Sequence, residues 1–307
     1  MVLTDGMRKI RAVPLVALTL VLGLAAPAAA TQTEVILLPG ATSAEAITAA
    51  PGDMFYAADM FQGTIYRGNV RTGTAEVFIH TPPGAQSVGM DLDVRHGLLF
   101  VAGGNGGKAY VYDIHTRALV ASYTFGDPSV SFINDVTVTP YGAWFDDSSE
   151  PQLYFVPDVF GVLGPPHTLH LSGPAAGPPG SFTINDITST PSGDTLLVAP
   201  TLVGKLMTID PRTGTSAIVA GVDVPNADGV LLSGRDLWVT QIDNRVTRWH
   251  LNGDLTSGTA VKTITDPLFH APLTSVRFGD RLAVVNSHLD TGFPPTSPTY
   301  EVLVLHD

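Results

Sequence analysis

The sequence predicts an all-β fold made of six similar sheets, and three observations support this prediction. A strand–turn–strand unit recurs along the chain, the copies follow one another at a nearly constant interval, and together they fill most of the 307 residues. In the clearest copy, a Pro-Ser-Gly-Asp turn at 191–194 precedes the apolar run 196–198. Because proline presets φ and glycine allows a positive φ, this tetrapeptide indicates a tight turn between two strands.

Aligning these turns identifies one equivalent position at the start of the first strand of each repeat. These anchor positions are Glu45, Val88, Asn134, Asn185, Asp228 and Leu273. They lie 43, 46, 51, 43 and 45 residues apart. A period of roughly 40–50 residues with several strands per repeat is typical of a β-propeller. Six units of this length account for residues 31–307, so we predict a six-bladed β-propeller.

Most repeats carry two further strands after the first hairpin. The expected third strands are 64–67, 109–112, 152–156, 205–209, 245–251 and 300–305, and the expected fourth strands are 75–79, 119–124, 168–171, 216–219 and 261–264. The sixth repeat ends at Asp307 after its third strand, whereas the apolar segment 34–38 is left over before the first anchor. We predict that this N-terminal strand completes the last blade, which closes the ring and removes a free sheet edge.

The first 30 residues have the pattern of a signal peptide. A basic cluster at 8–11 precedes an apolar run at 13–26 and three alanines at 28–30. The apolar run is shorter than the about 20 residues that span a bilayer as a helix. We therefore expect cleavage after Ala30, no membrane association afterwards, and a secreted or periplasmic single domain covering 31–307. Whether the chain begins at Met1 or Met7 stays open.

The chain is acidic and lacks cysteine. It holds 16 Lys and Arg against 28 Asp and Glu, which is a formal net charge of −12. Residues 1–30 contain three basic and one acidic residue, so the remainder carries −14. This excess of negative charge argues against nucleic acid or an anionic membrane surface as a partner and is compatible with a bound cation. Without cysteine there is no thiol chemistry and no disulfide, and we expect a monomer stabilised by its core.

The anchor positions carry the candidate chemistry. In a β-propeller the first strand of each blade runs along the central channel, so the six anchors are expected to form a ring at one mouth. Val88 and Leu273 are apolar, whereas the other four anchors offer side-chain oxygens, two of them from carboxylates. Because hard divalent cations prefer all-oxygen sites, we expect one divalent metal ion, Ca²⁺ first, with Zn²⁺, Mg²⁺ or Mn²⁺ as alternatives. The competing interpretation is a wet channel whose polar residues bond only to backbone or water.

This set of residues resembles the regucalcin–gluconolactonase family of six-bladed β-propellers, over essentially the whole chain after residue 30. The resemblance rests on Glu45 in the first repeat, Asn134 before a Pro-x-Gly turn, Asn185 before Pro-Ser-Gly-Asp, and Asp228 before Leu-Trp-Val. It implies that Glu45, Asn185 and Asp228 hold a divalent metal. It also implies that Asn134 lies beside the metal and contacts the substrate or the metal.

The chain departs from the family pattern around this set. Members often carry a basic residue two positions before the third-blade Asn, and here that position is Phe132. Phe61, Phe132, Phe182 and Phe293 are candidates to line a more apolar pocket, although ordinary packing is the favoured interpretation for each of them taken alone. His288, in a loop on the anchor side, is a further candidate for contact with the substrate.

Together these features predict a secreted, metal-dependent hydrolase that acts on a small lactone or ester. The metal would polarise the carbonyl and lower the pKa of a bound water. Asp228 would take the proton and Asn134 would orient the substrate oxygen. Two alternatives use the same scaffold: a non-catalytic binding propeller with a structural divalent metal, and an activity of the strictosidine-synthase or isomerase type. A Gly-x-Ser-x-Gly elbow and a phosphate-binding loop are both absent from the sequence.

Overall fold

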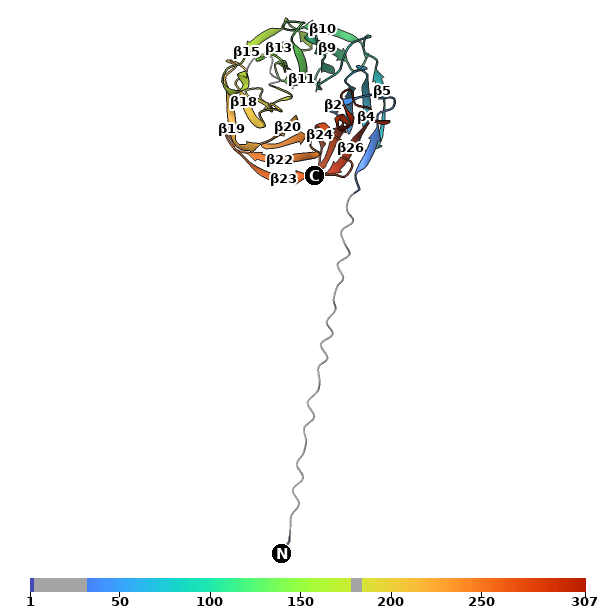
Figure 1. Cartoon of the computed structure of the whole chain (residues 1–307), viewed down its shortest axis with the longest axis vertical. Helices are drawn as coiled ribbons and strands as arrows, with labels where there is room; N and C mark the ends of the chain where they lie inside the picture. Colours follow the sequence, from blue (N-terminus) through green and yellow to red (C-terminus); the bar gives the residue numbers. More distant parts are fainter. Residues whose placement is uncertain (3–31, 178–183) are drawn as a thin grey trace. The chain divides into compact units, whose positions relative to one another are not determined.

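Six antiparallel sheets follow one another along the chain and surround a common axis (Figure 1). The computed structural model describes residues 1–2, 32–177 and 184–307. Residues 3–31, which hold nearly all of the predicted signal peptide, and Phe182 lie outside the described residues. Within the described part of the chain, no helix has the length and apolar character needed to cross a membrane. The predicted all-β, six-bladed β-propeller is confirmed.

The first three blades contain the predicted strands in order. Blade 1 consists of β2 (Ala44–Ala50), β3 (Met54–Asp59), β4 (Ile65–Asn69) and β5 (Thr74–Ile79). Blade 2 consists of β6 (Met90–Asp93), β7 (Leu98–Ala102), β9 (Lys108–Asp113) and β10 (Leu119–Thr124). Blade 3 consists of β11 (Phe132–Thr139), β12 (Gly142–Asp147), β13 (Gln152–Val159) and β15 (His167–His170), and the short strands β8 (Gly104–Asn105) and β14 (Val162–Leu163) pair with β11 and β13.

The last three blades repeat this order. Blade 4 consists of β16 (Ile187–Ser189), β17 (Leu196–Val198), β18 (Lys205–Ile209) and β19 (Ser216–Asp223). Blade 5 consists of β20 (Ala227–Ser233), β21 (Asp236–Gln241), β22 (Arg245–Leu251) and β23 (Gly258–Ile264). Blade 6 consists of β24 (Pro272–Phe278), β25 (Arg281–Asn286), β26 (Glu301–His306) and β1 (Glu34–Leu37). Two short 3-10 helices, η1 (Gly173–Ala176) and η2 (Leu289–Thr291), lie in the loops after β15 and β25.

The N-terminal strand closes the ring, as predicted. β1 pairs antiparallel with β26, with Ile36 opposite Val302, so the sheet order in blade 6 is β1-β26-β25-β24. Ile36 is fully buried in an apolar cluster with Phe55 and Tyr66 of blade 1. The first and last parts of the chain are therefore joined by both hydrogen bonds and apolar packing, which leaves blade 6 with four strands.

The apolar core lies between neighbouring blades. Phe100 in blade 2 and Phe145 in blade 3 are fully buried in one cluster, and their rings meet edge-on with 6.3 Å between centroids. Leu197 in blade 4 and Leu237 in blade 5 belong to another cluster of the same kind. Because each blade buries both faces against its neighbours, the strands carry consecutive apolar residues rather than a strict alternation.

The innermost strands share an irregularity at the anchor positions. β2, β11, β20 and β24 contact the first strands of the neighbouring blades around the ring. In all four, the pairing with the second strand shifts register at the anchor, between residues 44 and 47, 133 and 136, 227 and 229, and 272 and 275. Such a β-bulge bends a strand and redirects its side chains. These bulges are located where each strand enters the channel.

Candidate functional site

The four polar anchors lie together at one mouth of the channel. Glu45, Asn134, Asn185 and Asp228 line one cavity of about 410 Å³. The other residues that line it are Met60, Phe61, Gln86, Asn105, Phe132, Leu289 and Phe293. The four oxygen-bearing side chains therefore form one polar group in the lining of this cavity. The rest of the lining is largely apolar.

Three of these anchors form a continuous hydrogen-bonded chain across three blades. Asn134 Nδ2 donates to Asn185 Oδ1 over 2.8 Å, and Asn185 Nδ2 donates to Asp228 Oδ1 over 2.6 Å. Asn134 Nδ2 also donates to Ser148 Oγ over 3.0 Å, and that hydroxyl donates to the Ile184 carbonyl over 2.6 Å. Ser148 therefore ties blade 3 to the segment that carries Asn185, and both amides are held in one orientation.

Burial disfavours the ionised form of both carboxyl groups in the ring. Burial raises the pKa of Glu45 well above its usual value, and the nearby Asp228 and Asp135 raise it further. Burial raises the pKa of Asp228 to about 7, against the opposing effect of the hydrogen bond from Asn185. Among the described residues that line the cavity and the channel beneath it, none is Lys, Arg or His. Within this described lining, no cationic side chain balances the carboxylates.

A carboxylate behind the ring holds the β11 bulge in place. Asp146 Oδ1 accepts hydrogen bonds from the backbone amides of Asn134 (3.2 Å) and Asp135 (2.8 Å). Asp146 is fully buried, and its Oδ2 has no hydrogen-bond partner within the described part of the chain. Burial, together with the negative charge of Asp135, raises the pKa of Asp146 well above its usual value. The bulge that presents Asn134 is thus fixed by a side chain outside the cavity.

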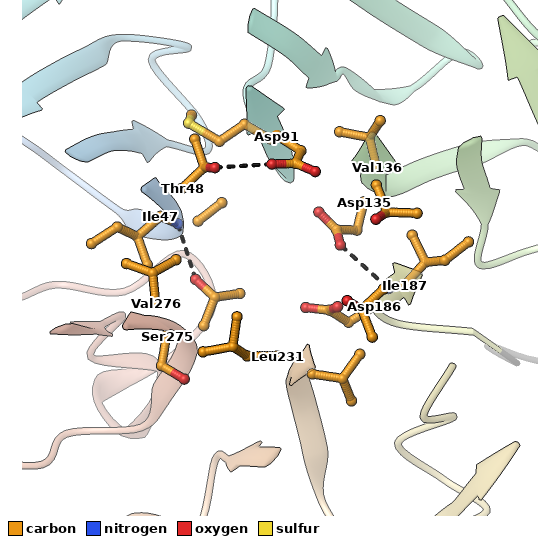
Figure 2. Close-up of a pocket in the computed structure, with 16 residues that line it drawn as sticks. Ile47, Thr48, Asp91, Asp135, Val136, Asp186, Ile187, Leu231, Ser275 and Val276 are labelled. Carbon is orange, nitrogen blue, oxygen red and sulfur yellow. Dashed lines mark hydrogen bonds between the residues drawn. The ribbon is translucent and has the colours of Figure 1, made fainter. Parts of the chain in front are cut away.

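A second set of carboxylates lies deeper in the channel. Figure 2 shows Asp91, Asp135 and Asp186 around a cavity of about 100 Å³, each from a different blade. Asp91 is fully paired, because it accepts from Thr48 Oγ1 (3.1 Å) and from the Val138 amide (2.7 Å).

Asp135 and Asp186 are hydrogen-bonded to each other through their side chains. Burial raises the pKa of Asp135 to about 7, while the hydrogen bond from Asp186 lowers it. Burial, and then the negative charge of Asp135, raises the pKa of Asp186 well above its usual value, and the same hydrogen bond raises it further. The group of carboxyl side chains therefore continues from the ring into the channel, and burial disfavours the ionised form of both Asp135 and Asp186.

Sequence reasoning identified the anchors but missed Asp135 and Asp186 as a pair. A signal was present at the position after each anchor, which is Asp in two repeats and Gly in two others, Gly89 and Gly229. A Cβ on Gly89 would lie 2.1 Å from Asp135 Oδ1 and 2.5 Å from the Asn134 carbonyl oxygen. The glycine in blade 2 is therefore required by the close approach of the aspartate in blade 3.

Three of the four aromatic residues named as pocket candidates lie in its wall, and the fourth, Phe182, is outside the described residues. Phe61, Phe132 and Phe293 all line the cavity, and the rings of Phe61 and Phe293 meet edge-on with 5.4 Å between centroids. His288, predicted to contact the substrate, is not among the residues that line the cavity. Its ring is buried, where Nε2 bonds to Glu301 Oε1 over 3.0 Å, and its neighbour Leu289 forms that part of the wall.

Comparisons with known proteins identify the fold alone. No protein-family model matches the chain, and no curated protein matches it in sequence. Among solved structures, it is similar to a chain of the mitotic checkpoint complex (TM-score 0.63, 12% identity, 96% of this chain and 99% of that chain).

It is also similar to the β-propeller domain of Cps50 (Swd1) from Myceliophteria thermophila (TM-score 0.58, 17% identity, 83% and 82% covered). A protein from Lactobacillus plantarum is similar too (TM-score 0.57, 18% identity, 86% and 88% covered). At these identities the similarity establishes a β-propeller and says nothing of its activity.

Proposed function

We propose that this protein is a divalent-metal-dependent hydrolase that acts on a small lactone or ester. The observation that carries the proposal is the ring of Glu45, Asn134, Asn185 and Asp228. Two half-buried carboxylates and two carboxamides meet at the channel mouth and face a largely apolar cavity, and no Lys, Arg or His is among the described residues that line it. This combination supports a cation site that opens onto a substrate pocket.

The donor set fits a hard divalent cation, with Ca²⁺ the first expectation. Glu45, Asn185 and Asp228 would hold it, with Asn134 beside them, because all four offer oxygen ligands. The raised pKa values of Glu45 and Asp228 support this assignment, because a bound cation would favour the ionised forms that burial disfavours. When bound, such a cation supplies Lewis-acid polarisation of a carbonyl oxygen and lowers the pKa of a water.

The chain's own residues would supply proton transfer, orientation and a dry pocket. Asp228 is the candidate base, because it is the ring carboxylate whose oxygen is already oriented by Asn185. Asn134, fixed by Ser148 and by the bulge above Asp146, would orient the substrate oxygen. A wall that includes Phe61, Phe132 and Phe293 favours an apolar acyl or lactone ring over a strongly charged sugar acid.

The test compares two substitutions at equivalent anchors. Asp228→Ala should weaken Ca²⁺ binding at least about tenfold, roughly 1.4 kcal/mol, and abolish turnover of a panel of lactones and aryl esters. Val88→Ala truncates the same position on another blade and should change neither, because valine offers no donor atom. Calorimetry and turnover of the tag-free full chain measure both. Tight Ca²⁺ binding by Asp228→Ala would overturn the proposal, whereas binding by the parent without turnover would favour a non-catalytic binding propeller.

A further inference from the structure

A second group of metal-ligand side chains lies on blade 6, outside the ring. One ring nitrogen of His270, one ring nitrogen of His288 and one carboxylate oxygen of Asp290 all lie within 4.8 Å of one another. His270 belongs to the loop before β24, His288 follows β25, and Asp290 lies in η2. Two imidazoles and one carboxylate form a donor set that differs from the all-oxygen ring. This set suits Zn²⁺ and other divalent transition-metal ions better than Ca²⁺.

The backbone brings the two histidines together. The His288 amide donates to the His270 carbonyl over 3.0 Å, and Ser287 Oγ donates to the Ala271 carbonyl over 2.6 Å. The two imidazole rings are nearly parallel, with 5.0 Å between centroids and 15° between planes. His270 Nδ1 lies 3.1 Å from Asp290 Oδ2. Backbone and side-chain hydrogen bonds between the two loops therefore hold the three ligand groups close together.

Two buried polar side chains, Glu301 and Asn286, hydrogen-bond to the loops that carry these histidines and orient them. His288 Nε2 bonds to Glu301 Oε1 over 3.0 Å, and that oxygen also accepts from Asn286 Nδ2 over 2.7 Å. Glu301 is 7% exposed and Asn286 is fully buried. A carboxylate acceptor favours the tautomer with the proton on Nε2, which leaves the lone pair on Nδ1 for a ligand. Asn286 Oδ1 also accepts from the His270 amide over 3.0 Å, so one side chain positions both loops.

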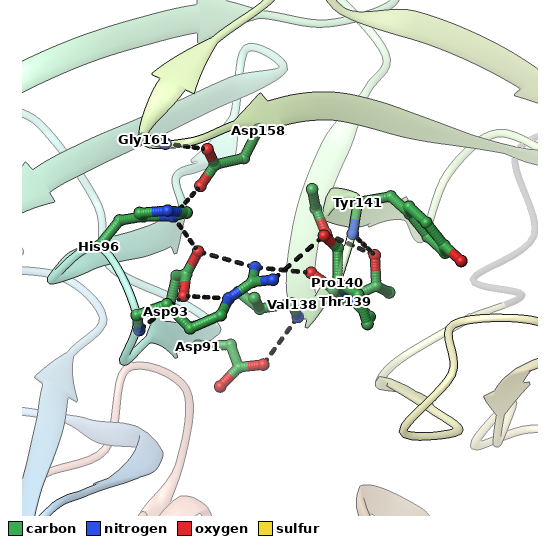
Figure 3. Close-up of polar contacts among 11 residues, drawn as sticks. Asp91, Asp93, His96, Val138, Thr139, Pro140, Tyr141, Asp158 and Gly161 are labelled. Carbon is green, nitrogen blue, oxygen red and sulfur yellow. Dashed lines mark hydrogen bonds and ion pairs between the residues drawn. The ribbon is translucent and has the colours of Figure 1, made fainter.

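Asp93, His96 and Asp158 on blades 2 and 3 form a comparable cluster, but Arg95 already balances its negative charge. There His96 Nδ1 lies 2.9 Å from Asp93 Oδ2 and 3.0 Å from Asp158 Oδ2 (Figure 3). Arg95 donates to both oxygens of Asp93, from Nε over 3.0 Å and from Nη2 over 2.9 Å. The guanidinium already supplies the positive charge that a cation would bring. The group on blade 6 has two imidazoles, and the side-chain hydrogen bonds and ion pairs of His270, His288 and Asp290 within the described residues are with one another and with Glu301, not with an arginine.

We propose that His270, His288 and Asp290 bind a divalent transition-metal ion, of which Zn²⁺ is the representative, independently of the ring. Three protein ligands leave a position open for water or another ligand. The metal joins η2 to the loop before β24. Leu289 in η2 and Phe293 beyond it line the cavity, so a metal here braces that side of the pocket wall.

The test measures Zn²⁺ binding to the tag-free full chain by calorimetry, with Co²⁺ absorption as a report on ligand type. The parent should bind one Zn²⁺ that His270→Ala weakens at least tenfold, roughly the effect of losing one ligand. His270 and Asp290 are both exposed, so Asp290→Asn serves as a second variant that keeps the fold. Glu301→Gln should weaken binding about 10–100-fold by releasing the His288 ring.

His250→Ala is the matched control. His250 is exposed and bonds to Asp236 over 2.7 Å, but it belongs to no such three-ligand group in the described part of the chain. His250→Ala should leave Zn²⁺ affinity unchanged, as should Asp228→Ala, which separates this site from the ring. Equal Zn²⁺ affinity for the parent, His270→Ala and Asp290→Asn would overturn the proposal. So would a parent that binds no Zn²⁺ at micromolar concentration, or loss of binding in Asp228→Ala alone.

Discussion

Asn185 donates a 2.6 Å hydrogen bond to Asp228 across the boundary between blades 4 and 5. This bond offsets part of the unfavourable burial of the Asp228 carboxylate, yet its pKa still lies at about 7. An amide can orient a carboxylate but cannot neutralise it, so ionisation of Asp228 and Glu45 is disfavoured unless a cation is bound. The stability of the protein should therefore depend on pH and on divalent cations together.

We expect the cation-free protein to lose stability as the pH rises from about 4 to about 7. Asp228 and Asp135 both have a folded-state pKa of about 7, above their ordinary value of 3.8, so the folded state binds more protons in this range. Stability is then fully present below about pH 4 and is lost as the pH rises through 7. Scanning calorimetry in EGTA should show the melting temperature falling by several degrees over this range.

Calcium should remove this pH dependence, because a bound cation stabilises the ionised carboxylates. Asp228→Asn offers the matching control: the amide cannot ionise, so the cation-free variant should show a shallower slope and little response to Ca²⁺. A parent protein whose melting temperature follows the same pH curve with and without Ca²⁺ would contradict the assignment of the ring as a cation site.

Closure of the ring should depend on one buried side chain of β1. Ile36 is fully buried against blade 1, whereas the next residue, Leu37, is 55% exposed. Ile36→Ala should lower the free energy of unfolding by about 2–5 kcal/mol, because it removes apolar contacts and leaves a cavity. Leu37→Ala should change it by no more than about 0.5 kcal/mol. Urea denaturation compares the two, and similar losses would mean that β1 does not close the last blade in solution.

The fold was accessible from the sequence because its determinants are local and repeated. Each blade contains its own turn-forming residues. Six copies at a nearly constant period predict a six-bladed β-propeller. The unpaired segment 34–38 then had only one sheet to complete. The four polar anchors were found for the same reason: an aligned position in a cyclic repeat becomes a ring in space.

The remainder of the site depends on contacts that sequence spacing does not encode. The support from Asp146 depends on the β-bulge in β11, and the pairing of Asp135 with Asp186 joins this bulge to the segment before β16. His288 was expected at the cavity, but Asn286 and Glu301 hold its ring in the interior of blade 6. Its neighbour His270 comes from a different loop, so no periodic pattern joins the two.

The close approach of Gly89 to blade 3 gives the sharpest test of how the channel is built. A Cβ at this position would meet the Asp135 carboxylate at 2.1 Å and the Asn134 carbonyl oxygen and Asp135 Cα at 2.5 Å each. Two of these three atoms belong to the backbone of the β11 bulge, so rotating a side chain cannot relieve the clash. The strand that carries Asn134 must therefore move away from Gly89.

Gly89→Ala should therefore damage both the fold and the ring. We expect a loss of about 1–3 kcal/mol in the free energy of unfolding, which is the usual effect of overpacking, measured by urea denaturation. Because the displaced strand carries Asn134, and Asn134 orients Asn185, Ca²⁺ affinity measured by calorimetry should fall as well. Gly253→Ala is the matched control, since a Cβ there meets nothing within 4 Å, and it should alter neither quantity. If Gly89→Ala keeps both its stability and its Ca²⁺ affinity, blades 2 and 3 are not in close contact at the bulge, and Asn134 does not depend on that packing for its position in the ring.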